Sequence, residues 1–123
     1  MLLNLSNHPS PHWPPPQLAA AQEQFGDVID LPFPAIDPEA DTAEVEQLAA
    51  EYENTAVERL QGARPRAVHL MGEMSFTLAL TARLQRRGIA VYCSTTRRQV
   101  LEEKDGTKTT RFVFVRFRQY PVV

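Results

Sequence analysis

The sequence predicts an α/β protein with a doubly wound, mostly parallel sheet and a C-terminal β-hairpin at one edge of that sheet. Three observations predict this class. Short apolar segments alternate with helical patterns along the chain, a hairpin pattern follows the last of them, and 123 residues suit one domain with a real core. We therefore expect a single domain over residues 1–123.

The first half predicts two strands and two helices. An apolar strand over 2–6 is followed by a stiff loop, in which four of the residues 11–16 are proline. Because proline is accepted in the first turn of a helix, we expect a helix from near Pro16 to Gly26. A second strand follows over 27–31. An amphipathic helix then begins at Asp41 or Thr42 and ends before Gly62.

The second half predicts two further strands, a helix between them and a hairpin. The strands cover 67–71 and 89–93, and the helix between them ends at residues 86–88. Residues 94–98 are expected to form a loop that leaves the fourth strand. The segments 99–104 and 107–120 then flank Asp105-Gly106, a dipeptide typical of hairpin turns.

Polar residues follow three of the four strands of the predicted parallel sheet, whereas prolines follow the second. In doubly wound sheets, ligands bind beyond the carboxyl ends of strands, where the strand order reverses. The order 2-1-3-4 makes the three polar ends neighbours, so we prefer it to 3-2-1-4. The sequence then predicts a site at this rim, formed by Ser6, Asn7, His8 and Ser10, by Gly72 and Glu73, and by Ser94, Thr95, Thr96, Arg97 and Arg98.

The segment 94–98 is the strongest local signal for an anionic ligand, because hydroxyl groups and guanidinium groups both bind phosphate oxygens. The alternative is a capped turn with solvated arginines. Gly72 lets a ligand approach the backbone, and the helix that follows offers free N–H groups. Glu73 is either a cap of that helix or a group that handles a proton.

Histidines provide the other candidates for proton transfer. His8 follows the first strand, where an imidazole could transfer protons, or it is a loop histidine bonded to the backbone. His12 and Trp13 are candidates for stacking on a base, although such a tryptophan more often plugs the edge of a core. His69 lies inside a strand, and we interpret it as a hydrogen-bonded core residue.

The sequence gives little support to a metal-dependent enzyme. No set of cysteine and histidine residues has zinc spacing, and no phosphate-binding loop or nucleophile elbow occurs. Asp27, Asp30 and Asp37 are dispersed in the acidic half, away from the predicted site. We therefore expect no metal and no cofactor.

Charge divides the chain into two halves. Residues 1–62 carry 11 acidic side chains and one basic, and residues 63–123 carry 4 acidic and 12 basic. This asymmetry indicates either a polyanion-binding face on the second half or attraction between the halves, within one fold or across a dimer. One cysteine, no signal peptide and no long apolar run lead us to expect a cytoplasmic protein without a membrane partner.

Three stretches together resemble the small CRISPR-associated proteins of the CARF, or ring-nuclease, group. They are Asn4–Pro9, Met71–Phe76, and Ser94–Arg97 ahead of Phe112–Arg118. The resemblance implies a Rossmann-like homodimer that binds cyclic oligoadenylate made during type III CRISPR antiviral defence. Some members also cleave the ring without a metal, with the ribose 2′-OH as nucleophile. A two-fold dimer matches the symmetry of a four-nucleotide ring, so cyclic tetra-adenylate is the expected ligand, with no duplex DNA.

On this reading the catalytic candidates are His8, Glu73, Ser94 and Arg97. His8 or Glu73 would move the proton, and Arg97 or Ser94 would hold the developing charge on the phosphate. The ligand-binding candidates are Ser6, Asn7, Ser10, Gly72, Thr95, Thr96 and Arg98. Three alternatives stay open: a module that binds the ring without cutting it, a protein-interaction subunit, and an unrelated nucleotide enzyme on the same fold.

Overall fold

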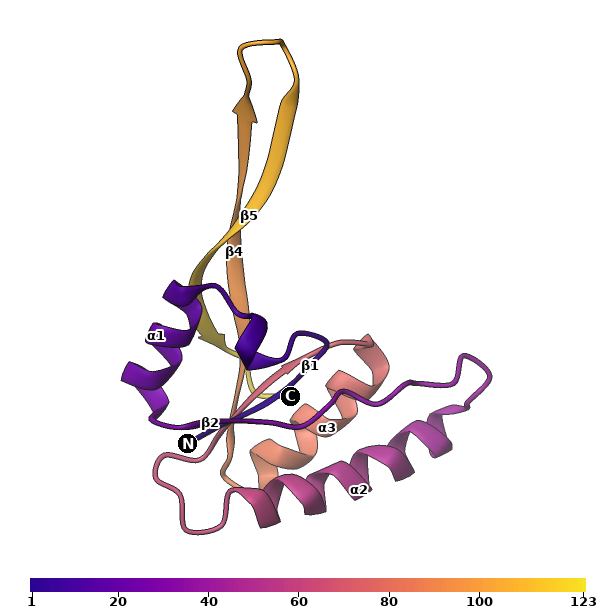
Figure 1. Cartoon of the computed structure of the whole chain (residues 1–123). Coiled ribbons are helices and arrows are strands. Elements are labelled where there is room, and N and C mark those ends of the chain that lie inside the picture. Colours follow the sequence, from indigo (N-terminus) through magenta and orange to yellow (C-terminus); the bar gives the residue numbers. More distant parts are fainter.

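The computed structural model describes all residues, 1–123, and has one five-stranded sheet between two layers of helices (Figure 1). The strands are β1 (Leu2–Ser6), β2 (Val28–Asp30), β3 (Ala67–Met71), β4 (Ala90–Glu102) and β5 (Lys108–Gln119), and the helices are α1 (Pro15–Phe25), α2 (Thr42–Arg59), α3 (Met74–Arg86) and the short 3₁₀ helix η1 (Ser10–His12).

The strand order is β2-β1-β3-β4-β5, in which the first four strands are parallel and β5 pairs antiparallel to β4. The predicted fold class, the order 2-1-3-4 and the edge hairpin are therefore confirmed. After β1, the chain forms β2 on one side of β1 and then β3 on the other side of β1. The strand order thus reverses between β1 and β3, the point at which such sheets bind ligands.

Each face of the sheet buries its own apolar cluster. On one face, Leu3 and Leu5 of β1 and Val68 and Leu70 of β3 pack with residues of α2 and α3, including Phe76. On the other face, α1 contributes Ala21 and Phe25, which pack with Leu2, Trp13, Ala67 and Phe117. Side chains of a strand alternate between the two faces, so the α1 face also receives Asn4, Ser6 and His69, which are buried polar residues.

The helix ends follow the expected local chemistry. Asp41 begins α2 with a capping box, in which its carboxylate accepts from the Glu44 amide at 2.8 Å and the Glu44 side chain faces the Asp41 amide. Proline occupies the first turn of α1, and Gly26 ends that helix with a φ of 87°.

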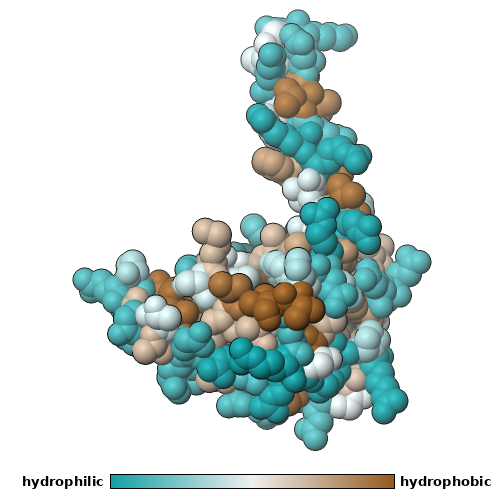
Figure 2. All heavy atoms as spheres, turned by 180° about the vertical axis from the view of Figure 1, so that it is seen from behind, coloured by the Kyte–Doolittle hydropathy of each residue, from teal (hydrophilic) through white to brown (hydrophobic).

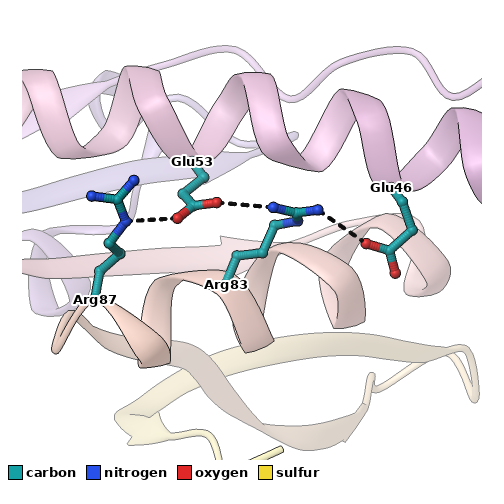
Figure 3. A network of polar contacts seen from close by, with 4 residues as sticks. All are labelled: Glu46, Glu53, Arg83 and Arg87. Atoms are coloured by element: carbon teal, nitrogen blue, oxygen red, sulfur yellow. Dashed lines mark hydrogen bonds and ion pairs between the residues drawn. The ribbon is translucent and has the colours of Figure 1, made fainter.

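Ion pairs join the acidic and basic halves of the chain across the α2–α3 contact (Figure 3). Arg83 of α3 lies 3.5 Å from Glu46 and 3.1 Å from Glu53, both on α2. Arg87 completes the network at 2.8 Å from Glu53. Hydrogen bonds from Arg87 outweigh the burial of Glu53 and, with the Arg83 contacts, hold the pKa of that carboxyl below its ordinary value. Part of the charge asymmetry therefore serves attraction within one chain.

One element prediction was wrong. Residues 94–98 form no loop, because β4 continues unbroken from Ala90 to Glu102 and pairs with β5 along its whole outer length. The two strands leave the body as a long twisted ribbon (Figure 1), with one register shift at Thr95/Thr96. The β-branched residues Thr95, Thr96 and Val100 favour a strand, and the partner strand supplies the hydrogen bonds that a loop would lack.

The outer ribbon has no core of its own. Residues 96–112 are all exposed, and Val100, Leu101 and Phe112 are among the exposed large apolar side chains. Figure 2 shows apolar patches that interrupt the hydrophilic surface of this projecting part. The turn at its tip contains Gly106 with a φ of 87°, and Asp105 accepts from the amide and the hydroxyl of Thr107.

Candidate functional site

A cavity of about 510 Å³ opens on the α1 face at the carboxyl ends of β1 and β3, next to the base of the ribbon. It lies at the reversal of the strand order, where the fold predicts a ligand site. Aromatic, imidazole, hydroxyl and amide groups line it together. The lining residues are Ser6, Asn7, His8, His12, Trp13, Pro14, Gln17, His69, Met71, Gly72, Ser94, Thr96, Phe112 and Phe114.

The loop after β1 is held by its backbone, which leaves the His8 side chain free to face the cavity. The carbonyl oxygen of His8 accepts from Asn4 Nδ2 at 2.8 Å and from Trp13 Nε1 at 2.9 Å, and Ser6 Oγ lies 3.2 Å from it. The residue itself is exposed. A fixed backbone with an exposed imidazole is the arrangement that a proton-transfer residue needs.

Trp13 forms the wall of the cavity and also belongs to the core. Only 7% of its surface is exposed, and its ring meets the rings of His69 and Phe117 with centroids 5.3 and 5.9 Å apart. The expectation that it plugs the core edge is thus met, while Phe112 is 68% exposed beside it. Of the aromatic side chains in the lining, His8, His12 and Phe112 are exposed.

A series of hydrogen bonds runs from β2 to β4 beneath the cavity, with the buried residues Asn4 and His69 at its centre. Asp30 Oδ1 accepts from Asn4 Nδ2 at 2.8 Å, Asn4 Oδ1 lies 2.8 Å from His69 Nδ1, and His69 Nε2 lies 3.1 Å from Ser94 Oγ. The register of β1 and β3 pairs Asn4 with His69 directly, which explains why they meet. This series of hydrogen bonds ends at the cavity, because His69 and Ser94 are both lining residues.

Burial sets the ionisation of His69, whereas hydrogen bonds set that of Asp30. Burial, followed by the nearby His8, lowers the pKa of His69 from 6.5 to about 4, so its imidazole is neutral at pH 7. Burial would raise the pKa of Asp30. Hydrogen bonds from the Ser10 side chain, the Asn4 side chain and the Ser10 amide outweigh it, and they hold that pKa below its ordinary value.

The structure brings six of the sequence-predicted site residues together and leaves five outside the cavity. Those in the lining are Ser6, Asn7, His8, Gly72, Ser94 and Thr96. Thr95, Arg97 and Arg98 lie on β4, and Thr95 donates to the Arg116 carbonyl at 3.1 Å. Arg97 and Arg98 are exposed on the ribbon.

The other two outside residues have structural contacts. Ser10 is buried, and its hydroxyl donates to Asp30 Oδ2 at 2.5 Å. Glu73 caps α3, where its carboxylate accepts from the amides of Ser75 and Phe76, both at 2.9 Å. The Ser75 hydroxyl, followed by these amides, lowers the pKa of Glu73, so its carboxylate is ionised at neutral pH.

Gly72 occupies a position at the cavity wall where an aromatic ring leaves no space for a side chain. A Cβ at this position would lie 2.3 Å from the ring of Phe33, which packs in the loop after β2. The absence of a side chain therefore makes room for an aromatic ring of the same chain, as well as bringing backbone to the cavity wall.

Sequence reasoning missed Asn4, His69 and Asp30 as members of the site. His69 was interpreted as a core residue, which its 2% exposure supports, but it also lines the cavity. Asp30 was expected to lie away from the site, and it does not line the cavity, but it contacts Asn4 because β2 pairs with β1. A signal exists in the sequence: Asn4 and His69 interrupt two otherwise apolar strands, and buried polar groups are retained only at a cost.

Two general features complete the description. No three side chains among His, Cys, Asp and Glu gather closely enough to hold a metal ion. None of the helices has both the length and the apolar character that crossing a membrane requires.

Comparison with known sequences gives a family and no curated relative. No curated protein matches the chain. One family model matches residues 1–118, which is nearly the whole chain, and its description is "Uncharacterized protein MJ1673 family". The match includes every helix and strand and ends at Arg118, one residue before the end of β5. The chain therefore belongs to the MJ1673 family.

Proposed function

We propose that this chain binds a cyclic oligoadenylate and cleaves it as a metal-independent phosphodiesterase, which would end type III CRISPR signalling. The observation that carries the proposal is the cavity at the strand-order reversal, in which exposed aromatic rings meet imidazole and hydroxyl groups. Cyclic tetra-adenylate is the first ring to test, because its two-fold symmetry matches a dimer.

The apolar part of the lining suits adenine. Phe112 is largely exposed, Phe114 is half-buried, and His12 in the same lining is exposed. Stacking of a base on an aromatic side chain is worth about 1–3 kcal/mol per base. The amide of Asn7 and the hydroxyl of Thr96 in the same lining offer hydrogen bonds to the edge of a base or to a ribose.

The phosphates of the proposed ring require arginine or lysine side chains, and a single chain does not supply these to its own cavity. No arginine or lysine is among the lining residues, whereas Arg97, Arg98 and Arg111 lie on the projecting ribbon. An isolated two-stranded ribbon is only marginally stable in water. A homodimer would cover the exposed apolar residues of the ribbon and carry its arginines to the ring, so the proposal includes a dimer.

Cleavage needs in-line attack of a ribose 2′-OH on the neighbouring phosphate, with charge stabilisation at the phosphate oxygens. His8 has the exposure and the fixed backbone that a proton-transfer residue requires. Ser94 in the same lining offers a hydroxyl group to the reacting ribose. A general acid or base of this kind contributes about 10²–10⁴-fold to the rate.

The test is incubation of the purified protein with labelled cyclic tri-, tetra- and hexa-adenylate in buffer that contains EDTA. We expect one ring to be converted to linear products that carry a 2′,3′-cyclic phosphate or a 3′-phosphate. Intact rings after long exposure at high protein concentration would contradict the cleavage proposal. Calorimetry with the same three rings then measures binding separately.

The second candidate is a module that binds the ring without cutting it. The absence of a cationic side chain from the lining of a single chain favours it, because phosphate cleavage needs such charge close to the reacting atoms. Micromolar or tighter binding without turnover would support this candidate, and absence of binding to all three rings would exclude both.

A further inference from the structure

Three buried polar residues lie side by side in the two central strands. Asn4, Ser6 and His69 are 1%, 6% and 2% exposed, although the strands around them consist of leucine and valine. Burying a polar group costs free energy unless hydrogen bonds satisfy it. Here each side chain has partners, and the chain of contacts leads from Asp30 to the cavity wall at Ser94.

The contacts determine which ring nitrogen of His69 carries the proton. Asn4 Nδ2 lies 2.8 Å from both the Asp30 carboxylate and the His8 carbonyl, two groups that only accept. The amide nitrogen must therefore face them, and Asn4 Oδ1 must face His69. His69 Nδ1 then has to donate, so it holds the proton, and Nε2 is left with a free lone pair.

The free nitrogen points at a hydroxyl of the cavity lining. His69 Nε2 lies 3.1 Å from Ser94 Oγ, and the alternative acceptor for that hydroxyl is Met71 Sδ at 3.3 Å. A thioether sulfur is a weak acceptor, so the Ser94 proton is directed at His69. The result is a hydroxyl, a base and an orienting amide in series, the arrangement that activates a hydroxyl for proton loss.

We propose that His69 Nε2 is the proton acceptor of the cavity, reached through the Ser94 hydroxyl, with Asn4 and Asp30 as positioning residues. This rests on the proposed cleavage of a cyclic oligoadenylate. The ribose 2′-oxygen gives its proton to Ser94 Oγ, and Ser94 gives its own to His69 Nε2. The 2′-oxygen forms a bond to phosphorus, the bond from phosphorus to the 5′-oxygen breaks, and the departing 5′-oxygen takes a proton from protonated His8.

The surroundings of His69 suit this role. Rings of Trp13 and Phe117 pack against the imidazole, with centroids 5.3 and 5.5 Å away, and exclude water from it. The charged or titratable neighbours are His8 on the loop after β1, which faces it, and Asp30 on β2, which acts through Asn4. On β3 and β4 its hydrogen-bond partner is the neutral Ser94. The imidazole is neutral at pH 7 and keeps the Nε2 lone pair, although the burial that lowers its pKa also makes it a weaker base.

The first measurement needs no substrate. Nitrogen NMR of ¹⁵N-histidine-labelled protein at pH 7 should report a protonated Nδ1 and an unprotonated Nε2 for His69. The Asn4→Ala variant removes the acceptor for Nδ1 and should mix the two tautomers, whereas Asn54→Ala on the exposed face of α2 should not change them. A wild-type His69 with its proton on Nε2 would overturn the inference.

The second measurement is single-turnover cleavage of cyclic tetra-adenylate, with binding followed separately by calorimetry. We expect His69→Gln to retain the ring affinity and to cleave about 100-fold more slowly or worse. Ser94→Ala should cleave at least 10-fold more slowly, and Asn4→Ala should lower kcat with little change in KM. Ser94→Ala and Asn4→Ala keep the imidazole in place, so they test the role even where His69→Gln does not fold.

The outcomes separate the two proposals. A wild-type protein that leaves every ring intact contradicts the proposed function, and the role of His69 falls with it. A wild-type protein that cleaves, alongside Ser94→Ala and Asn4→Ala variants that cleave equally fast, contradicts the role of His69 alone. Loss of cleavage with unchanged affinity in these variants supports both.

Discussion

At the scale of single residues, the polar groups inside β1 and β3 make stability depend on pH. His69 is 2% exposed, and its pKa falls from 6.5 to about 4 in the folded chain because burial penalises its charged form. Between these two values the unfolded chain binds the extra proton and the folded chain does not. The free energy of unfolding therefore rises with pH in this window. The stability that the neutral His69 contributes is lost as the pH falls from about 6.5 to about 4.

We predict that this single residue removes up to about 3 kcal/mol of stability between pH 6.5 and pH 4. Urea unfolding at a series of pH values measures it. The His69→Gln variant should have a flatter profile over the same window. The lowered pKa values of Asp30 and Glu53 also cost stability in acid, but they act below the ordinary carboxyl range, so the two effects separate. A wild-type profile that is level above pH 5 would contradict the prediction.

Gly72 supports a second prediction at this scale. A methyl group there would lie 2.3 Å from the Phe33 ring, so the ring must move. We expect Gly72→Ala to lower the free energy of unfolding by about 1–3 kcal/mol, the usual cost of overpacking. In a Phe33→Leu background the added methyl group has more room, and the double-mutant cycle should show a clear coupling between the two positions. Additive effects would mean that the ring is not the obstacle.

What the sequence predicts at this scale depends on whether a residue acts through its neighbours in the chain. The cap at Asp41 and the turn at Asp105-Gly106 follow from local patterns and are confirmed. Asn4 and His69 are 65 positions apart and meet only because β1 and β3 pair in one register. No local pattern reports that register, so their shared role could not be assigned before the sheet was known.

At the scale of elements, the contact between α2 and α3 depends on one carboxylate. The side chain of Glu53 is only 12% exposed and bonds Arg83 of α3 and Arg87 directly after it, whereas Glu46 is half exposed and bonds Arg83 alone (Figure 3). We predict that Glu53→Gln lowers the free energy of unfolding by about 1–2 kcal/mol, because two guanidinium groups lose their shared partner.

Glu51→Gln is the matched control, because Glu51 is exposed on the same helix and forms no ion pair. It should change stability by less than about 0.5 kcal/mol. Thermal unfolding of both variants at low and high salt measures the difference, which should shrink as salt screens the more exposed Arg87 pair. Equal losses in the two variants would show that the network adds nothing specific.

The ribbon is the element that the sequence predicted least well. Its turn and its two strands were expected, but the loop at 94–98 was not found, because β4 continues through these residues to Glu102. Hydroxyl and guanidinium groups favour a phosphate-binding loop when they are considered alone. The segment forms a strand instead, because Thr96, Arg97 and Arg98 pair with Phe114, Val113 and Phe112 of β5. Pairing of this kind depends on the second strand, which local composition does not describe.

We predict that the outer ribbon contributes little to the stability of the body. Arg98 and Phe112 pair across the two strands, so Gln99–Arg111 can be replaced by Asn-Gly, the preferred two-residue turn. Because the excised residues are all exposed, the urea midpoint of the shortened protein should stay close to that of the full chain. A large fall in the midpoint would mean that the ribbon packs against the body.

At the scale of the whole molecule, the fold keeps the cavity and the arginines of the ribbon apart. The cavity lies on the α1 face at the ends of β1 and β3, and its lining includes no cation. Arg97 and Arg98 stand on the outer part of β4, which leaves the body (Figure 1). Within one chain they do not line the cavity, so the proposed phosphate binding requires a second copy that supplies its ribbon.

This arrangement predicts complementation between two defective variants. Arg97→Ala/Arg98→Ala keeps His69 but lacks the two cations, and His69→Gln keeps the cations but lacks the proton acceptor. A mixed dimer of the two has one cavity with an intact His69 that faces an intact ribbon. Random exchange of subunits makes half of the dimers mixed, so about a quarter of the wild-type sites should return.

The measurement is cleavage of cyclic tetra-adenylate by each variant alone and by an equimolar mixture after subunit exchange. We expect the mixture to exceed the sum of the two variants severalfold, since each alone lacks one half of every site. If the arginines served the cavity of their own chain, each cavity in the mixed dimer would still lack one group. The rate of the mixture would then equal the sum, and the dimer with shared sites would be contradicted even if the wild-type protein cleaves the ring.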